Sequence, residues 1–145
     1  MYSTKLTPNL RYIITGIVNH SIVKRVLSVM DTGAKYTCYY AKALDSSLRE
    51  NQFNNSPTKY LSGFIDNGNN KMSVVKYYQY QVSQFTIGNI DLGKQMVWVT
   101  FDARAMDSII GMDILQQVSF LQYANTKEIH FFQSESELQT YVNAQ

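Results

Sequence analysis

The most informative stretch of the chain is Val29-Met30-Asp31-Thr32-Gly33-Ala34, in which two apolar residues lead into Asp-Thr-Gly-Ala. The residues before it, 22 to 30, are rich in β-branched side chains that alternate between two faces, which predicts a strand. A similar run, 11 to 18, is separated from it by the turn-like Asn19-His20-Ser21. The sequence therefore predicts a β-hairpin that places Asp31 at the end of a strand.

Most of the remaining chain also predicts short strands, bounded by turn residues. The strand-like runs are 61–65, 71–80, 74–87, 90–92, 95–101, 120–123 and 128–132. Between the first two, 66–70 contains Asn-Gly, a strong signal for a hairpin turn. Helical patterns cover 39–50 and about 113–118. Many short strands with few helices predict an all-β barrel or sandwich.

The C-terminal segment, 133–145, predicts a helix. Ser134 and Glu137 have the spacing of a capping box, in which the serine hydroxyl and the glutamate carboxylate each accept a backbone N–H. Apolar residues then recur at Leu138, Tyr141 and Val142. The pattern indicates a helix here, and its role in any dimer stays open.

The length and composition indicate one folded domain, residues 1–145. Hydrophobic residues make up 45% and charged residues 17% of the chain, which excludes a disordered protein. A net charge of +2 without basic clusters argues against a nucleic-acid partner. No apolar stretch reaches the roughly 18 residues of a membrane span. Cys38 is the single cysteine and no secretion signal is evident, so we expect a cytoplasmic location.

A second motif, Ser108-Ile109-Ile110-Gly111, precedes the helical pattern at 113–118. With Asp31-Thr32-Gly33-Ala34 and the intervening stretch 85–92, which contains Ile-Gly and a later Leu, it resembles the retropepsin-like aspartic proteases over about residues 10–132. The resemblance is closer to the bacterial, single-domain members than to the viral ones. It implies a closed retropepsin-like barrel, a short helix after Gly111, and a flap hairpin at about 63–71.

The resemblance implies an aspartic endopeptidase, which needs no metal or other cofactor. Water attacks the peptide carbonyl while one carboxylate takes its proton and a second carboxyl donates one. Two like charges so close cannot both ionise, and aspartic proteases are known for sharing one proton across such a pair. Only Asp31 among the seven aspartates precedes Thr-Gly. The resemblance therefore implies a homodimer with one Asp31 from each chain, acting on a peptide or protein substrate.

The resemblance also assigns supporting roles around Asp31. Thr32 would hold the two carboxyls coplanar by bonding across to the partner loop. Gly33 and Gly111 lack a Cβ, so backbone can approach them closely. The residues expected to line the substrate cleft are Ala34, Lys35, Phe64 and Ile65.

Lys35 departs from the family pattern, which has a small or acidic residue that commonly binds the substrate backbone. A lysine cannot accept a hydrogen bond, so that contact is missing or reversed. Lys35 either favours an acidic group in the substrate or points into solvent. The substrate preference of the family therefore does not carry over.

Several alternatives remain open at this stage. The same fold could serve as a catalytically inactive peptide-binding or assembly module. Asp-Thr-Gly could also be a simple turn in an unrelated small β-barrel. Asp66, in Phe64-Ile65-Asp66-Asn67-Gly68, is a rival catalytic acid, but it lacks the hydroxyl residue and Asn-Gly favours a turn.

Other reactive residue types have simpler interpretations. Asp113 fits the first turn of a helix, where the helix dipole favours a negative charge. Cys38 lies in an aromatic stretch and is expected to be buried and unreactive. His20 and His130 are a turn residue and a strand residue, and neither has partners at the spacing of metal ligands.

Overall fold

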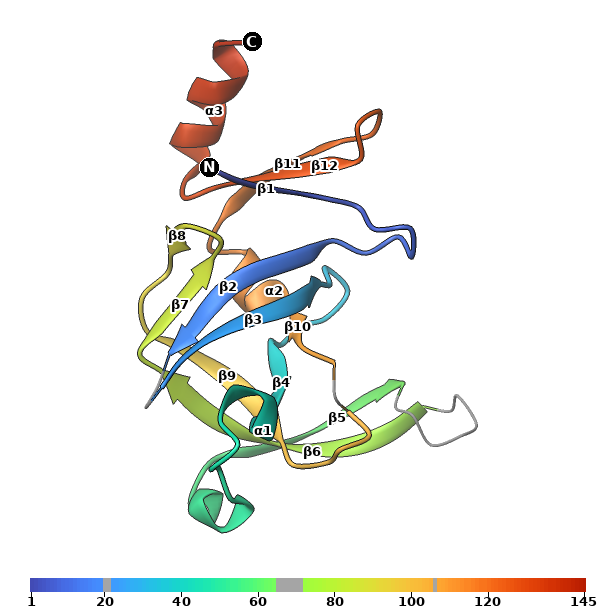
Figure 1. Ribbon diagram of the computed structural model, residues 1–145, viewed down its shortest axis with the longest axis vertical. Coiled ribbons are helices and arrows are strands. Elements are labelled where there is room, and N and C mark those ends of the chain that lie inside the picture. Colours follow the sequence, from blue (N-terminus) through green and yellow to red (C-terminus); the bar gives the residue numbers. More distant parts are fainter. Residues whose placement is uncertain (20–21, 65–71, 106) are drawn as a thin grey trace.

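The computed structural model describes residues 1–19, 22–64, 72–105 and 107–145, and it is mostly β-sheet (Figure 1). A nine-stranded sheet has the order β5-β6-β9-β4-β10-β3-β2-β7-β8, and a three-stranded sheet has the order β1-β12-β11. The strands of the larger sheet are β2 Ile13–Asn19, β3 Val23–Met30, β4 Cys38–Tyr40, β5 Thr58–Phe64, β6 Met72–Val82, β7 Gln84–Ile87, β8 Ile90–Asp91, β9 Gln95–Thr100 and β10 Ile109–Ile110. Those of the smaller sheet are β1 Tyr2–Lys5, β11 Ser119–Tyr123 and β12 Glu128–Phe132.

The β2–β3 hairpin forms as the alternation of its sequence predicts. The two strands pair antiparallel, from Ile13 opposite Val29 to Asn19 opposite Val23. Val26 and Ser28 point inward and are buried, whereas Leu27 between them is 67% exposed. Because β3 ends at Met30, Asp31 is the first residue after the strand.

The single strand expected over 74–87 is wrong, because Ser83 divides it into β6 and β7. The backbone N–H of Ser83 donates to the Asn19 carbonyl at 2.6 Å, and its hydroxyl donates to the same oxygen at 2.9 Å. As a result β6 pairs with β9 while β7 pairs with β2, so the sheet bends back toward its own start. No ladder among the described residues joins the end strands β5 and β8, so the closed barrel stays a prediction.

The hydrophobic core lies inside this bent sheet. Among the described residues, its largest fully buried side chains come from β2, β4, β6, β7, β9 and β10 of the larger sheet, from β12 of the smaller sheet and from α2 (Met112–Leu115). They include Ile14, Val82, Phe85, Ile87, Val97, Val99, Ile110, Ile114 and Leu115. The short helix expected after Gly111 is therefore present, and it begins at Met112, one residue earlier than its pattern indicates.

The helix expected over 39–50 is wrong. Tyr39 and Tyr40 belong to β4, which pairs in parallel with β9 and buries the Tyr39 ring. Only α1 (Ala41–Leu44) and the 3-10 helix η1 (Glu50–Phe53) are helical. Asp45 ends α1, because its carboxylate accepts both the backbone N–H of Ser47 at 2.9 Å and the Ser47 hydroxyl at 2.6 Å. Such a local side-chain turn competes with helix continuation.

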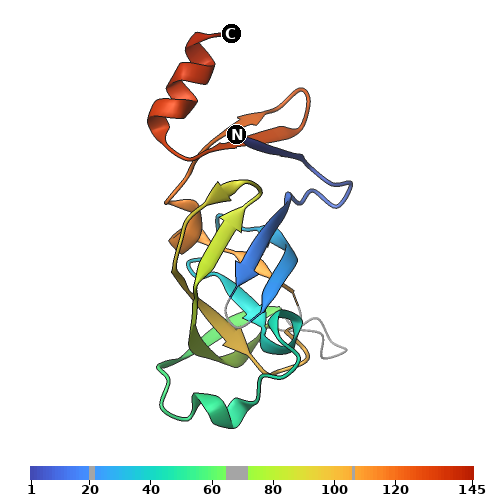
Figure 2. The same ribbon diagram turned by 60° about the vertical axis from the view of Figure 1, so that its left-hand side comes forward.

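The three-stranded sheet and α3 (Glu135–Asn143) lie at one end of the molecule, and α3 points away from the larger sheet (Figures 1 and 2). Its predicted start is confirmed, because the Ser134 hydroxyl accepts the Glu137 N–H at 3.2 Å. The Glu137 carboxylate accepts the N–H of Gln133 instead of that of Ser134. Tyr141 packs its ring 5.3 Å from Phe132 and anchors the helix.

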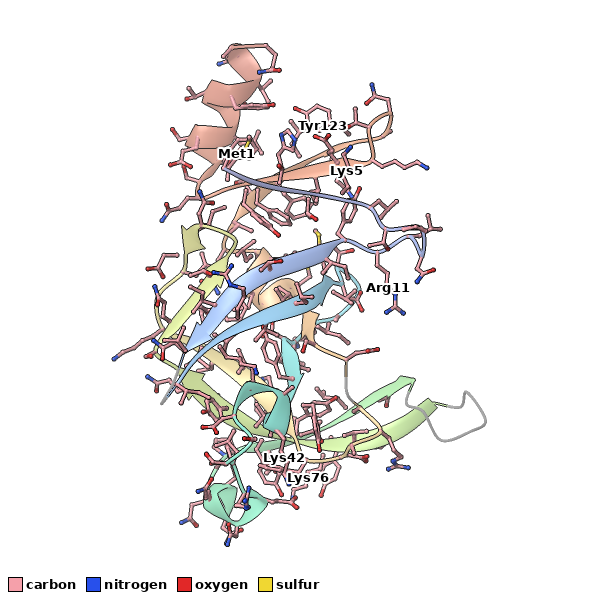
Figure 3. All side chains as sticks on the ribbon, in the orientation of Figure 1. Met1, Lys5, Arg11, Lys42, Lys76 and Tyr123 are labelled. Atoms are coloured by element: carbon pink, nitrogen blue, oxygen red, sulfur yellow. The ribbon has the colours of Figure 1, made fainter. Side chains whose placement is uncertain are left out.

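The N-terminal strand β1 is not foreseen by the sequence pattern. It pairs with β12, and its Tyr2 hydroxyl accepts the Thr15 N–H of β2 at 3.0 Å, which joins the two sheets. Lys5 and Tyr123 lie on the smaller sheet, far from Lys42 and Lys76 at the other end (Figure 3). Within the ranges the structure describes, no helix has both the length and the apolar content to span a membrane.

The close approach of β2 to β7 depends on Gly16, which has no Cβ. A Cβ at this position would lie 1.9 Å from the backbone oxygen of Thr86. We therefore expect Gly16→Ala to lower the free energy of unfolding by about 3 kcal/mol or more, measured by urea denaturation.

The control is Gly93→Ala. Gly93 has a φ of +68° with nothing within 4 Å of an added Cβ, so only the backbone conformation is penalised, by about 1 kcal/mol. If both variants lost the same free energy of unfolding, the close approach of β2 to β7 at Gly16 would be contradicted.

Candidate active site

Asp31 begins a tight loop that connects β3 to β4. Its backbone N–H donates to the Ile110 carbonyl at 3.0 Å, and its carbonyl accepts the Ala34 N–H at 3.2 Å. Its side-chain Oδ1 accepts the Gly33 N–H at 2.9 Å. The carboxyl is half-buried, while Thr32 and Gly33 are exposed. The loop therefore holds one carboxylate oxygen in a fixed position at the surface.

Strand β10 supports this loop from the side opposite its exposed tip. It lies parallel to β3 and antiparallel to β4, so it fills the gap that the loop leaves between them. At its end, a Cβ on Gly111 would lie 2.5 Å from the Tyr36 carbonyl oxygen and 2.8 Å from that of Ala34. The close approach expected at Gly111 is present, and a larger residue would push the loop away.

Thr37 is the buried centre of the support. Its hydroxyl donates to Asp113 Oδ1 at 2.6 Å and accepts the Gly111 N–H at 3.0 Å. Its backbone N–H donates to Asp113 Oδ2 at 3.1 Å. The N–H groups of Met112 and Asp113 in turn donate to the carbonyls of Ala34 and Lys35, at 2.8 and 3.1 Å. The loop, β10 and α2 are thereby joined into one unit.

The sequence interpretation of Asp113 as a first-turn helix residue is correct but incomplete. Asp113 is also the acceptor that fixes both polar groups of Thr37. Thr37 itself was not singled out from the sequence. A usable signal was present, because a hydroxyl residue in the apolar-aromatic stretch 36–40 must find a hydrogen-bond partner when it is buried.

The other sequence-predicted residues fall in different places. The Thr32 hydroxyl makes no hydrogen bond with any described residue. Lys35 is exposed, with its Nζ 5.4 Å from the centre of the Tyr36 ring. Phe64 pairs with Met72 in the last described rung of the β5–β6 hairpin. Ile65 and the rival acid Asp66 lie outside the described residues.

Cys38 and the histidines supply no second reactive centre in the described ranges. Burial, followed by the nearby Asp113 charge, raises the pKa of the Cys38 thiol to about 12, so it is a buried thiol and not a thiolate nucleophile. His130 is a strand residue as expected, but it does have a carboxylate partner, because its Nε2 lies 3.0 Å from Glu128. His20 lies outside the described residues. Among the residues that are described, no three His, Cys, Asp or Glu side chains gather into a metal site.

The chain resembles known proteins in its structure. No family model matches the sequence, and no curated protein matches it. Among solved structures, a retropepsin-like aspartic protease from Rickettsia conorii is similar in fold, with a TM-score of 0.61. The match covers 90% of this chain and 88% of that one at 15% sequence identity. The chain thus has the fold of that protease.

The Thr37 hydroxyl is expected to be essential to the loop. Thr37→Val keeps the volume but leaves the buried Gly111 N–H without its acceptor. It also removes the hydroxyl that donates to Asp113 Oδ1, which then keeps only the Ile114 N–H of its two donors. We expect a loss of about 2–3 kcal/mol in the free energy of unfolding, measured by chemical denaturation.

Thr37→Ser is the matched control, because it retains the hydroxyl and removes only a methyl group. We expect it to lose about 1 kcal/mol. If Thr37→Val were as stable as Thr37→Ser, the hydrogen bonds of this hydroxyl would not hold the loop.

Proposed function

We propose that this chain is one subunit of a homodimeric aspartic endopeptidase, in which the Asp31 carboxyls of the two chains activate water. The observation that carries the proposal is the Asp31 loop itself. It sets a half-buried carboxylate at the surface, fixes one of its oxygens through Gly33, and rests on the Thr37–Asp113–Gly111 network. The fold shared with a retropepsin-like aspartic protease supports the same assignment.

A second subunit is required by the chemistry. General acid and base steps on one peptide bond need two carboxyls within a few Å that share a proton. No other aspartate of this chain precedes Thr-Gly, so the second carboxyl must come from another copy on a two-fold axis. The exposed Thr32 hydroxyl, which bonds no described residue, is the group we assign to bracing the partner loop.

In the proposed reaction, one ionised Asp31 takes a proton from water as that water attacks the peptide carbonyl. The protonated Asp31 of the other subunit then gives its proton to the departing amine. Gly33, Ala34 and Lys35 line the cleft on the loop side. The β5–β6 hairpin serves as the flap over the peptide, and we assign Phe64, the last residue of β5, and Ile65 to substrate contact. The closed barrel implied by the resemblance is part of the same proposal. The single, buried cysteine suits the reducing cytoplasm in which we place the enzyme.

An inactive peptide-binding module is the second candidate. One observation favours it: β5 is an end strand of the larger sheet, and Tyr60 on it is 67% exposed. An edge strand with unpaired backbone groups can add an extended peptide as a further strand, without any chemistry. The two functions differ in whether Asp31 is needed.

The direct test is cleavage of a peptide library by the wild type and by Asp31→Asn, from about pH 4 to 7, with protein concentration varied. We expect the wild type to cleave and Asp31→Asn to lose at least about 10³-fold in rate. Activity per chain should fall on dilution, because the site forms only in the dimer.

Asp91→Asn is the control, since Asp91 is an exposed residue at the end of β8, where an asparagine can still accept the Gly93 N–H. Its activity should equal that of the wild type. Cleavage that survives Asp31→Asn would contradict the proposal. No cleavage at concentrations where a dimer is observed would favour the peptide-binding module.

A further inference from the structure

Two lysines and two aromatic rings meet between the Asp31 loop and β5. The Nζ of Lys59 lies 4.9 Å from the centre of the Tyr36 ring and 5.3 Å from that of Trp98. The Nζ of Lys35 lies 5.4 Å from the Tyr36 ring. Tyr36 and Trp98 meet edge to face at 6.0 Å. We call these four residues the cation-aromatic cluster.

No ion pair among the described residues neutralises the positive charge of this cluster. The ion pairs among the described residues are Lys5–Glu128, Arg104–Asp102 and His130–Glu128, and none involves Lys35 or Lys59. The hydrogen bond from Lys59 lowers the pKa of Tyr36, and the charge of Lys35 lowers it further, against an opposing effect of burial. Two ammonium groups therefore share one ring, and a negative partner would relieve their repulsion.

The two aromatic rings hold the cluster in a fixed position. Trp98 is buried, and its backbone N–H donates to the Thr37 carbonyl at 3.0 Å, so it is tied to the same support as the Asp31 loop. Lys59 extends from β5 over both rings, which limits the conformations of its long side chain. An ammonium held in place binds an anion at a lower entropic cost than a free one.

The position of the cluster matters because it bridges the two parts between which a peptide must lie. Lys35 and Tyr36 belong to the loop that carries Asp31, and Lys59 belongs to the strand that leads to the proposed flap. A peptide bound between Asp31 and the β5–β6 hairpin therefore passes beside Lys35 and Lys59. Its side chains would contact the two aromatic rings and two lysines that form no ion pair with any described residue.

We propose that the cation-aromatic cluster is a specificity site that binds an acidic side chain of the substrate, an inference that rests on the proposed peptidase function. The carboxylate accepts charge-assisted hydrogen bonds from Lys35 and Lys59 while its methylene groups contact Tyr36 and Trp98. Lysine is a point charge that suits a carboxylate without demanding a bidentate geometry. A substrate lysine at the same position is repelled.

The first test measures kcat/KM with short peptides in which each position in turn is Glu, Gln or Lys. At one position we expect Glu to exceed Gln by about tenfold in the wild type, with Lys poorest. The double variant Lys35→Met, Lys59→Met should lose this preference, because methionine keeps the packing on the rings and removes both charges. Lys5→Met, on the smaller sheet (Figure 3), removes one charge elsewhere and should keep the preference.

The second test measures binding alone, so that it does not depend on catalysis. Trp98 is the only tryptophan of the chain, and its fluorescence reports on the cluster directly. In the Asp31→Asn protein, we expect the Glu peptide to change this fluorescence at about tenfold lower concentration than the Gln peptide. The difference should shrink at high salt and vanish in the double lysine variant.

The outcomes separate the two claims. Equal cleavage and equal binding of the Glu and Gln peptides would overturn the specificity site and leave the peptidase proposal intact. Lysine-dependent binding of the Glu peptide without any cleavage by the wild type would support the specificity site as a feature of a peptide-binding module. A Glu preference that persists without both lysines would overturn the assignment to this cluster.

Discussion

The rest of the site depends on one buried hydroxyl, that of Thr37, and on the two groups it joins. Its oxygen lies 2.6 Å from Asp113 Oδ1 and 3.0 Å from the Gly111 nitrogen; Thr37 and Gly111 are buried and Asp113 is half-buried. In such surroundings an unsatisfied polar group is costly, so the three groups hold one another in place. The loop carrying Asp31 therefore shares the rigidity of β10 and α2, although its tip is exposed.

This support explains how a surface carboxylate can be positioned without being buried. Among the described residues, the donor to the Asp31 side chain is the Gly33 N–H, and in the proposed dimer this carboxyl meets the Asp31 of a second copy. The Thr32 hydroxyl, which bonds no described residue, and the single Asp-Thr-Gly motif fit the proposal that each chain supplies half of a catalytic centre. The cation-aromatic cluster, fixed to the same loop through Thr37, extends this half-site toward β5. On this account, the Thr37 network supports both the residue that acts as the acid and the residues that select the substrate.

The sequence predicts the parts of the fold that local pattern controls. The alternation of β2 and β3, the position of Asp31 after the strand and the Ser134 cap all follow from near neighbours in the chain. The close approach at Gly111 follows from the family resemblance, because its contacts are with Ala34 and Tyr36, far away in the chain. The features that the sequence does not reveal depend on contacts between residues that are far apart in the chain. The break at Ser83 requires Asn19, and the strand β1, with its unremarkable Tyr-Ser-Thr-Lys sequence, requires β12. The role of Thr37 and the meeting of Lys59 with Tyr36 likewise appear only once the strands are assembled.

Subunit mixing is the most direct test of the central claim, which is that two Asp31 carboxyls from two chains form one site. Wild type and Asp31→Asn are combined in equal amounts and allowed to exchange, with total chain concentration held constant, and peptide cleavage is measured. Random pairing leaves about a quarter of the dimers with two Asp31 residues, so we expect about a quarter of the wild-type rate. A rate of about one half would mean that each chain acts alone, and it would contradict the account.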